Sequence, residues 1–379
     1  MEKIVALLTI ENIGIVVFGI FTFCLLIQLG YFLFRFIQLA LYKEKPAEKN
    51  QPPVSVIICA RNEFENLKTY LSQVLEQDYP EYQVIVVNDC SWDESEKYLE
   101  ELEEKYKHLK VVTLAEQERY QHGKKFALAI GIKSAAYEHL LLTDADCYPE
   151  SNQWIKQMMS GYQQGSQIVI GYGAYIKQKG IINTWIRFDT AFNAMQYFSF
   201  AIARRPYMGV GRNLSYTQSL FFKNKGFASH QHILSGDDDL FINETANRSN
   251  AEVCLSAGSF TYSQPKTNFN DWFKQKKRHV SASKLYKSKH KFALGLFFTT
   301  HVFLYFSLIT LLIIKFKIVW VASAYGLRLV TQLFIFGKCL QKLKETDLIW
   351  LIPVYDFMIA IVYPLIALSN LFVKNKTWK

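Results

Sequence analysis

Closely spaced cysteines are absent from this 379-residue chain. Its six cysteines are scattered, and neither a Cys-x-x-Cys zinc site nor a disulfide framework has support. Free thiols in a cytoplasmic domain are therefore the expectation. The chain also lacks internal repeats and low-complexity segments, and half of its residues are hydrophobic. That composition excludes an intrinsically disordered protein, because so apolar a chain can bury a core.

Acidic residues are scarce in the last third of the chain. Residues 265–379 hold 18 basic and four acidic side chains, whereas residues 51–264 hold 20 basic and 25 acidic ones. The net charge of +10 therefore belongs to one region, and the middle of the chain is acidic. This distribution is not that of a uniformly basic nucleic-acid-binding protein, and we expect no nucleic-acid partner.

Long hydrophobic runs lie at both ends of the chain. Residues 13–41 form a run longer than the ~20 residues that a membrane span needs, and no signal-peptide cleavage site follows it. A buried soluble helix is the alternative for this run. Three further runs cover residues 292–314, 318–336 and 348–373. We therefore expect a multi-pass protein of the cell (inner) membrane, surrounded by membrane lipids.

Charged residues near these runs indicate the topology. Lys43, Lys45 and Lys49 directly follow the first run, which predicts that the next segment is cytoplasmic. Arg328 and Asp356 interrupt two C-terminal runs, and ionisable groups are costly at membrane depth unless they face the protein interior or water. We predict that these two residues either pair with each other or lie near the membrane interfaces.

Between the hydrophobic ends, short apolar runs alternate with amphipathic ones. Strands are predicted over residues 54–60, 82–88, 110–114 and 139–143. Helices are predicted over residues 66–77, 94–107 and 125–134. This alternation predicts an α/β domain with a mainly parallel sheet, and ligands bind beyond the carboxyl ends of such strands. We expect an N-terminal transmembrane anchor (1–45), a soluble domain (50–290) and a C-terminal transmembrane region of about three spans (291–379).

Acidic residues at the predicted strand ends are candidates for chemistry. Asp144 and Asp146 follow an apolar strand, and their oxygens suit Mg²⁺ or Mn²⁺, with a solvated turn as the alternative. Asp89 ends another strand and is either a helix cap or an acceptor for a nucleobase or ribose. The run 237–239 consists of three aspartates, whose mutual repulsion raises their pKa and suits a general base. A solvated acidic turn is the alternative for this run.

Two further segments have two interpretations each. Gln275, Arg278 and His279 share a helix face and suit a diphosphate, or this basic stretch is a patch for anionic lipid headgroups. Residues 181–207 are rich in aromatic side chains and read as an amphipathic helix. This helix either lies in the membrane interface, which favours a lipid-linked acceptor, or belongs to the core of the soluble domain.

The order of these motifs resembles glycosyltransferase family 2, whose members have the GT-A fold and use nucleotide-diphosphate sugars. Residues 86–91 resemble the Asp-Asp-Gly-Ser element of that family, with Asn88 at its first position and Cys90 in place of its glycine. Residues 123–128 resemble its Gly-Lys-x-x-Ala-Leu element. Residues 144–146 match its metal motif, and the run 237–239 lies where its Glu-Asp base motif is expected. Residues 275–279 resemble its Gln-x-x-Arg-Trp element, with His279 in place of tryptophan.

The resemblance implies a role for each matched residue. It implies nucleotide-sugar binding for Ala60, Glu63, Asp89, Lys124, Asp144, Gln275 and Arg278. Asp146 would coordinate Mg²⁺ or Mn²⁺, and either Asp237 or Asp238 would take the proton from the acceptor hydroxyl. Residues of the acceptor-side segment would be Gly211, Arg212 and Asn213. The implied fold is a Rossmann-like mixed sheet of the GT-A type, flanked by transmembrane helices.

The leading hypothesis is a membrane-anchored inverting glycosyltransferase of the hexosyltransferase class. Its donor would be a UDP- or GDP-linked sugar, and its acceptor a lipid-linked or growing saccharide at the cytoplasmic membrane face. A processive polysaccharide synthase of the same fold is the alternative, which His279 and the small number of C-terminal spans disfavour. A membrane-tethered dinucleotide oxidoreductase would need Gly-x-Gly-x-x-Gly after the first strand, where residues 61–64 contain no glycine. A non-catalytic scaffold is disfavoured by acidic motifs at all three positions.

Overall fold

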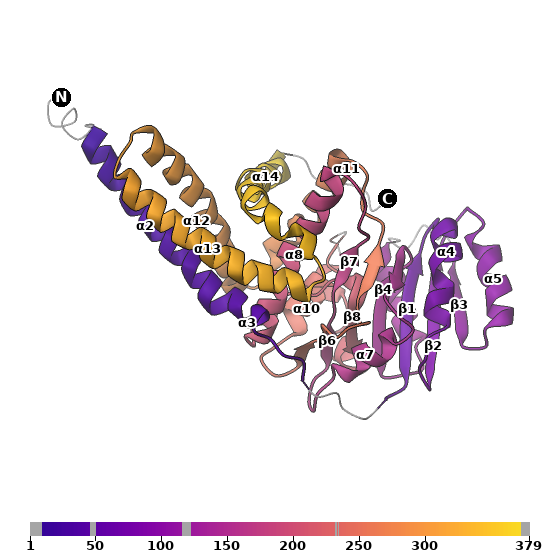
Figure 1. Ribbon diagram of the computed structural model, residues 1–379. Coiled ribbons are helices and arrows are strands. Elements are labelled where there is room, and N and C mark those ends of the chain that lie inside the picture. Colours follow the sequence, from indigo (N-terminus) through magenta and orange to yellow (C-terminus); the bar gives the residue numbers. More distant parts are fainter. Residues whose placement is uncertain (1–9, 46–50, 116–122, 232, 234, 373–379) are drawn as a thin grey trace. The chain divides into compact units, whose positions relative to one another are not determined.

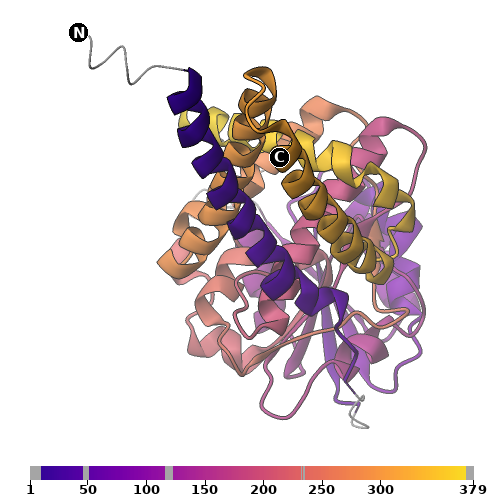
Figure 2. The same cartoon turned by 60° about the vertical axis from the view of Figure 1, so that its left-hand side comes forward.

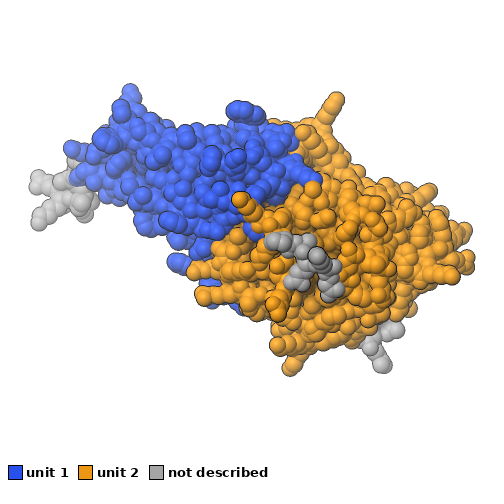
Figure 3. Space-filling model, turned by 60° about the horizontal axis from the view of Figure 1, so that its bottom comes forward, with its two compact units in different colours: residues 1–42, 287–373 blue, residues 43–286, 374–379 orange. Residues whose placement is uncertain are grey.

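The computed structural model describes residues 10–45, 51–115, 123–231, 233 and 235–372, which form two compact units (Figures 1 and 3). One unit comprises Met1–Tyr42 and Lys287–Val373, and the other is centred on Lys43–Tyr286. The N-terminal and C-terminal apolar regions therefore belong to the same unit. The segment that lies between them in sequence forms a unit of its own.

The first unit is helical. Its elements are α2 (Ile10–Tyr31), the π-helical η1 (Phe32–Phe36), α3 (Ile37–Ala40), α12 (Ser288–Ile313), α13 (Ile318–Lys342), η5 (Thr346–Leu351) and α14 (Ile352–Phe372). Figures 1 and 2 show α2 running alongside α12 and α13. Four helical segments are long and apolar enough to cross a membrane: Ile10–Ala40, Ser288–Ile313, Ile318–Lys342 and Thr346–Asn370. These segments correspond to the four predicted runs and support membrane association.

A polar cluster lies inside this helical unit, around the carboxylate of Asp356. Arg328 donates to Asp356 Oδ2 from Nη2 (3.0 Å), and Gln332 donates to Oδ1 (2.6 Å). The hydroxyl of Tyr305 donates to Oδ2 (2.6 Å), and the ring of His301 lies 2.9 Å from the backbone oxygen of Asp356. Arg328 and Gln332 are completely buried, and Asp356 is 1% exposed. The predicted pairing of Arg328 with Asp356 is confirmed, and the pair joins α13 to α14.

The second unit is built on a mixed seven-stranded sheet in the order β3-β2-β1-β4-β8-β6-β9. Its strands are β1 (Val54–Ala60), β2 (Tyr82–Asp89), β3 (Leu109–Leu114), β4 (His139–Asp144), β6 (Ile168–Ile170), β8 (Leu214–Thr217) and β9 (Ala251–Val253). The first four strands of that order run parallel, and β8 is antiparallel to both β4 and β6. A second sheet has the order β5-β10-β7 and consists of β5 (Cys147–Pro149), β10 (Thr261–Ser263) and β7 (Gly173–Tyr175). The predicted α/β class is confirmed.

Helices cover both faces of the large sheet, because alternate side chains of each strand point to opposite faces. Val56 of β1 and Val84 of β2 belong to the core beneath α4 (Phe64–Leu75), while Ile85 and Val87 of β2 belong to the core beneath α6 (Lys124–Lys133). The α6 helix comes close to the sheet at Gly131. A Cβ atom there would lie 2.8 Å from Ile57 and 2.9 Å from Val87, so a side chain would push the helix outward. Gly131 thus allows the C-terminal part of α6 to pack closely against the sheet.

The remaining helices complete the second unit. They are α5 (Ser95–Lys105), α7 (Trp154–Ser160), α8 (Ile181–Ile202), η2 (Gly211–Asn213), α9 (Gln218–Lys223), η3 (Ala228–His230), α10 (Asp239–Thr245), α11 (Phe269–Ala282) and η4 (Ser283–Leu285). Of these, α8 corresponds to the aromatic segment 181–207. Its Trp185, Phe188 and Phe192 are at most 2% exposed, and Trp185 packs edge-on against Trp272 of α11. The core interpretation of this segment therefore holds, and the interfacial one is wrong.

The buried ion pair of the helical unit yields a stability prediction. We expect Arg328→Met to destabilise the protein by about 3–5 kcal/mol, because it leaves the Asp356 carboxylate buried without a cation. The double variant Arg328→Met/Asp356→Leu removes both charges, and we expect it to recover most of the loss. The measurement is thermal unfolding of the purified protein in detergent. A double variant as unstable as the single one would contradict this account.

Candidate active site

Three parallel strands end side by side at one edge of the large sheet. Ala60 at the end of β1 is in register with Asn88 of β2, and Cys59 is in register with Asp144 at the end of β4. Asp89 follows Asn88, and both are completely buried. The fold therefore brings together residues that were predicted at separate strand ends, at the edge where α/β sheets bind ligands.

Hydrogen bonds join the loops that follow β1 and β2. The backbone N–H of Asn62 donates to Ser91 Oγ (2.9 Å), and the N–H of Trp92 donates back to Asn62 Oδ1 (3.0 Å). The N–H of Phe64 donates to Asp93 Oδ2 (3.0 Å). These bonds hold the two loops as one rim beside Glu63, the residue that precedes α4.

The Asn88 amide is an unusual feature of this rim. Neither its Nδ2 nor its Oδ1 has a hydrogen-bond partner among the described residues, although the side chain is completely buried. An unsatisfied buried amide costs roughly 1–3 kcal/mol, so its retention beside Asp89 fits a ligand that supplies a donor and an acceptor. Cys90 follows with φ = 55°, a left-handed conformation that favours glycine.

Lys124 connects the metal motif to the predicted base motif. Its Nζ lies 2.8 Å from Asp144 Oδ1 and 3.0 Å from Asp237 Oδ2. Burial lowers the pKa of Lys124, but the adjacent carboxylates of Asp144 and Asp237 outweigh it and raise the pKa well above its usual value. The lysine is therefore a permanent cation at the centre of the acidic site.

Lys125, the next residue of α6, anchors a neighbouring segment. Its Nζ donates to the backbone oxygens of His230 (2.7 Å) and Ile233 (3.0 Å). Burial lowers its pKa to about 8. The first turn of α6 thus binds the metal motif through Lys124. Through Lys125 it binds the segment that precedes the acidic run.

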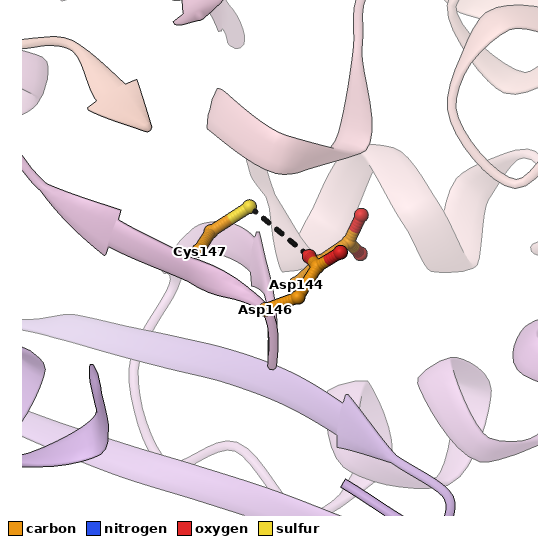
Figure 4. Close-up of side chains that lie close together, drawn as sticks. All are labelled: Asp144, Asp146 and Cys147. Carbon is orange, nitrogen blue, oxygen red and sulfur yellow. Dashed lines mark hydrogen bonds between the residues drawn. The ribbon is translucent and has the colours of Figure 1, made fainter. Parts of the chain in front are cut away.

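The metal motif presents a compact set of donor atoms. Ligand atoms of Asp144, Asp146 and Cys147 lie within 4.8 Å of one another, and Figure 4 shows their side chains together. The thiol of Cys147 donates to Asp146 Oδ1 (3.4 Å), and burial raises the pKa of that thiol well above its usual range. A protonated thiol leaves the two partly exposed carboxylates as the donors, which suits a hard cation such as Mg²⁺ or Mn²⁺.

The three consecutive aspartates have different surroundings. Asp237 pairs with Lys124, whereas Asp238 Oδ2 accepts the N–H of Gly211 (2.7 Å) and its Oδ1 accepts the N–H of Asp239 (2.7 Å). Asp239 Oδ2 accepts the hydroxyl of Tyr286 (2.6 Å). Gly236 precedes the run with φ = 98°, and a Cβ there would lie 2.4 Å from Leu240, so this turn requires glycine.

These surroundings separate the pKa values of the three carboxyl groups. Burial raises the pKa of Asp237, but the ion pair with Lys124 outweighs it and lowers the pKa below its usual value. Burial, followed by the charge of Asp237, raises the pKa of Asp238 to about 6. Burial and the charge of Asp238 raise the pKa of Asp239 to about 7. Only Asp238 of the three is more than marginally exposed to solvent.

The segment η2 connects the metal motif to the acidic run. Gly211 binds Asp238 through its N–H, and a Cβ atom at Gly211 would lie 3.5 Å from Lys124 Nζ. The backbone oxygen of Arg212 accepts the hydroxyls of Thr143 (3.0 Å) and Thr261 (2.9 Å). The first two residues of the predicted acceptor-side triplet therefore form structural hydrogen bonds beside the acidic run.

Asn213, the last residue of that triplet, is completely buried. Its Nδ2 donates to the backbone oxygens of Tyr172 (3.0 Å) and Ser259 (2.8 Å), and its Oδ1 accepts the indole N–H of Trp154 (3.1 Å). All three hydrogen bonds of the amide are therefore made with protein atoms, and the acceptor-side role of Asn213 stays a prediction.

Helix α11 carries the predicted diphosphate-binding face. Gln275 donates to the hydroxyl of Tyr175 on β7 (3.3 Å). Lys276, on the same helix, forms a buried ion pair with Asp189 of α8 (2.9 Å). The ion pair directs Lys276 towards α8 and so fixes the rotation of α11 about its axis. Gln275 and Arg278 are both partly exposed.

Several residues of the site were missed at the level of sequence. Lys125 is adjacent to Lys124 and was hidden within the Gly-Lys-x-x-Ala-Leu element. Tyr175 and Tyr286 stand in segments without a motif, and their contacts with Gln275 and Asp239 depend on the tertiary fold. No local pattern in the sequence marks either tyrosine.

Strand order, acidic strand ends and the small second sheet define a nucleotide-sugar transferase fold of the GT-A type. A mannosyltransferase from Pyrobaculum calidifontis, solved in complex with GDP-mannose and Mn²⁺, has the same fold, with a TM-score of 0.62 at 17% sequence identity over 97% of this chain and all of that one. Residues 55–224 match the family described as Glycosyl transferase family 2. The segment 55–224 therefore matches that family, in agreement with the resemblance of the motifs and with the predicted enzyme class, a glycosyltransferase.

Curated relatives agree with this assignment over part of their length. The chain is 28% identical over 193 residues to the glycosyltransferase AglE of Haloferax volcanii, which covers 49% of this chain and 59% of that protein. It is 28% identical over 141 residues to an uncharacterized glycosyltransferase of Haemophilus influenzae, covering 36% of this chain and 42% of that protein. A poly-β-1,6-N-acetyl-D-glucosamine synthase of Staphylococcus epidermidis is 36% identical over 93 residues, 24% of this chain and 21% of the synthase. The chain thus spans about a fifth to three fifths of these relatives' lengths.

The raised pKa of Asp239 predicts a pH dependence of stability. A carboxyl group whose pKa rises from 3.8 to about 7 on folding stabilises the folded state below pH 3.8, and this contribution is lost as the pH rises through 7. We expect the wild type to lose stability between pH 5 and pH 8 relative to Asp239→Asn, which cannot ionise. Thermal unfolding across this pH range provides the measurement. Tyr286→Phe removes a donor to the carboxylate and should steepen the loss, whereas parallel profiles for all three proteins would contradict the assignment.

Proposed function

We propose that the protein transfers a sugar from a UDP- or GDP-linked donor to a lipid-linked or saccharide acceptor, with inversion at the anomeric carbon. The observation that carries the proposal is the convergence of Asp144, Asp146, Lys124 and Asp237 at the sheet edge of a glycosyltransferase family 2 domain. The Pyrobaculum neighbour, which was solved with GDP-mannose, supports a nucleotide-sugar donor.

The nucleoside half of the donor binds at the rim beyond β1 and β2. Asp89 and the backbone near Ala60 and Glu63 hold the base and ribose, and the unsatisfied amide of Asn88 offers one donor and one acceptor to the same ligand. Asp144, next to β1 in the sheet, contacts the ribose or the sugar. The rigid pairing of the two loops keeps this rim in place before the donor arrives.

The diphosphate half of the donor binds between the metal motif and α11. Asp146, with Asp144 beside it, would hold Mg²⁺ or Mn²⁺, and the bound cation would supply Lewis-acid stabilisation of the leaving diphosphate. Gln275 and Arg278 approach the diphosphate from α11, and Lys124 adds a fixed positive charge at the sheet edge. Preorganised cations of this kind stabilise the charge that develops on the leaving group.

The acidic run supplies the base. One carboxylate of the pair Asp237 and Asp238 takes the proton from the acceptor hydroxyl, whose oxygen attacks the anomeric carbon in line with the departing diphosphate. The oxygen–carbon bond forms as the carbon–diphosphate bond breaks, so the configuration inverts. Asp239, the third carboxyl group of the run, accepts a hydrogen bond from the hydroxyl of Tyr286.

The apolar helices define where the reaction takes place. We propose that the helical unit is embedded in the cell (inner) membrane and that the transferase domain lies on the cytoplasmic side, because Lys43 and Lys45 follow the first span. Nucleotide sugars are water-soluble, and a domain joined to four membrane helices acts at the membrane face. This location suits an acceptor that is itself attached to the membrane.

A donor-binding experiment tests the proposal. We expect UDP or GDP with Mn²⁺ to raise the melting temperature of the purified protein, and NAD to leave it unchanged. Incubation of membranes with a panel of UDP- and GDP-linked sugars should then release the matching nucleoside diphosphate and label a lipid or saccharide fraction. Stabilisation by NAD alone would refute the proposal in favour of an oxidoreductase.

The base is identified by two matched variants. A general base contributes roughly 10²–10⁴-fold to the rate, so we expect Asp238→Asn or Asp237→Asn to lose that much turnover while binding the nucleotide nearly as well as the wild type. The Asp238 variant is the first to test, because its carboxyl is partly exposed and its pKa of about 6 suits proton transfer. Turnover numbers and nucleotide affinities of both variants provide the measurement. If both retain more than about a tenth of the wild-type rate, the base lies outside the acidic run.

A further inference from the structure

Arg212 has a side chain that the acceptor-side expectation does not explain. Its backbone is held in η2 beside Asp238, but its guanidinium extends over the small sheet. Nη1 donates to Ser263 Oγ (2.7 Å) and to the backbone oxygen of Ala174 (3.3 Å), and the group stacks on the Tyr175 ring, 4.2 Å from its centroid. The protein therefore holds the guanidinium through Nη1 and through the ring of Tyr175.

The register of the small sheet shows what lies on either side of this guanidinium. Ser263 of β10 pairs with Cys147 of β5 on one side and with Tyr175 of β7 on the other. These three residues form a row across the sheet, in which neighbouring strands are ~4.8 Å apart. Arg212 is bonded to the middle of the row. Asp146, the metal ligand, directly precedes Cys147 at one end.

Gln275 lies at the other end of the row, where it donates to the hydroxyl of Tyr175 (3.3 Å). Arg212 therefore stands between Asp146 and Gln275, the two groups that would bind the diphosphate from opposite sides. Both hydrogen bonds of the guanidinium use Nη1, so within the described part of the chain Nε and Nη2 have no protein acceptor. Arg212 is only half-buried, which leaves this edge open to a ligand.

We propose that Arg212 binds the diphosphate of the nucleotide-sugar donor and that Tyr175 holds its guanidinium in place for this purpose. The inference rests on the proposed function, which supplies the nucleotide-sugar donor. A guanidinium presents paired N–H groups that match phosphate oxygens, and such charge-assisted bonds are among the stronger ones in proteins. The sequence motif placed Arg212 on the acceptor side, whereas its position in the small sheet assigns it to the donor.

Nucleotide affinity separates this role from a structural one. We expect Arg212→Gln to weaken the binding of UDP or GDP, measured by calorimetry with Mn²⁺, by roughly 10- to 100-fold. The affinity for UMP or GMP, which lack the second phosphate, should change by less than threefold. A purely structural arginine would weaken both ligands equally and lower the melting temperature. Equal losses, or an unchanged diphosphate affinity, would overturn the inference.

Two conservative variants extend the test. Arg212→Lys keeps the charge but not the paired N–H groups, and we expect it to weaken diphosphate binding several-fold; if Arg212→Gln does not fold, a wild-type affinity in Arg212→Lys overturns the inference. Tyr175→Phe keeps the ring beneath the guanidinium and should lose less affinity than Arg212→Gln. Arg248→Gln, an exposed arginine before β9, is the matched control and should bind both ligands like the wild type.

The outcome also distinguishes this inference from the proposed function. If the wild-type protein binds neither UDP nor GDP in the presence of Mn²⁺, the proposed donor is wrong and the role of Arg212 falls with it. If the wild type binds a nucleoside diphosphate and Arg212→Gln binds it equally well, only the role of Arg212 is wrong. If Arg212→Gln instead raises the KM for the acceptor and leaves the diphosphate affinity unchanged, Arg212 binds the acceptor and the inference is wrong.

Discussion

The two ion pairs of Lys124 are the interaction on which the rest of the site depends. Its ammonium lies 2.8 Å from Asp144 and 3.0 Å from Asp237, and these carboxylates come from segments almost a hundred residues apart. Two carboxylates about 4 Å apart repel each other by roughly 1–4 kcal/mol in partly hydrated surroundings. The ammonium of Lys124 offsets this repulsion between Asp144 and Asp237 even before any ligand binds. The position of that cation depends on the seat of α6 against the sheet, where Gly131 allows the helix to approach Ile57 and Val87. A packing contact of α6 in the core thus contributes to the position of Lys124 between the two carboxylates.

The first half of the transferase domain was predictable from sequence, because its strands are short, mostly apolar and followed by amphipathic helices. The predicted strand over residues 54–60 matches β1, and the predicted helix over residues 125–134 is displaced by one residue from α6. The second half was less accessible. Its strands β6, β7 and β10 have three residues each, which is too short for a pattern, and their pairing joins segments far apart in the chain. The helix α8 has aromatic residues on all sides, so its sequence does not distinguish a membrane surface from a protein core.

Motif resemblance located the site residues but not their contacts. The acidic run was expected to supply a base, yet the different partners of Asp237, Asp238 and Asp239 follow from Lys124, Gly211 and Tyr286, which are distant in sequence. The departures from the family pattern also acquire physical meaning in the structure. Cys90 occupies a left-handed conformation where the family element has glycine, while Gly236 occupies a left-handed conformation directly before the acidic run. A comparison of sequence motifs does not reveal these backbone conformations.

The polar cluster of the helical unit has a consequence for how the protein enters its membrane. Arg328 lies within α13 and Asp356 lies within α14, so each helix alone would carry an unpaired charge into hydrocarbon, at a cost of roughly 2.5–3.5 kcal/mol or more. The short turn η5 joins the two helices, and Gln332 and Tyr305 are in place to receive the carboxylate as soon as it arrives. In a membrane, α13 and α14 would therefore be more stable as one paired hairpin packed against α12 than as two separate helices.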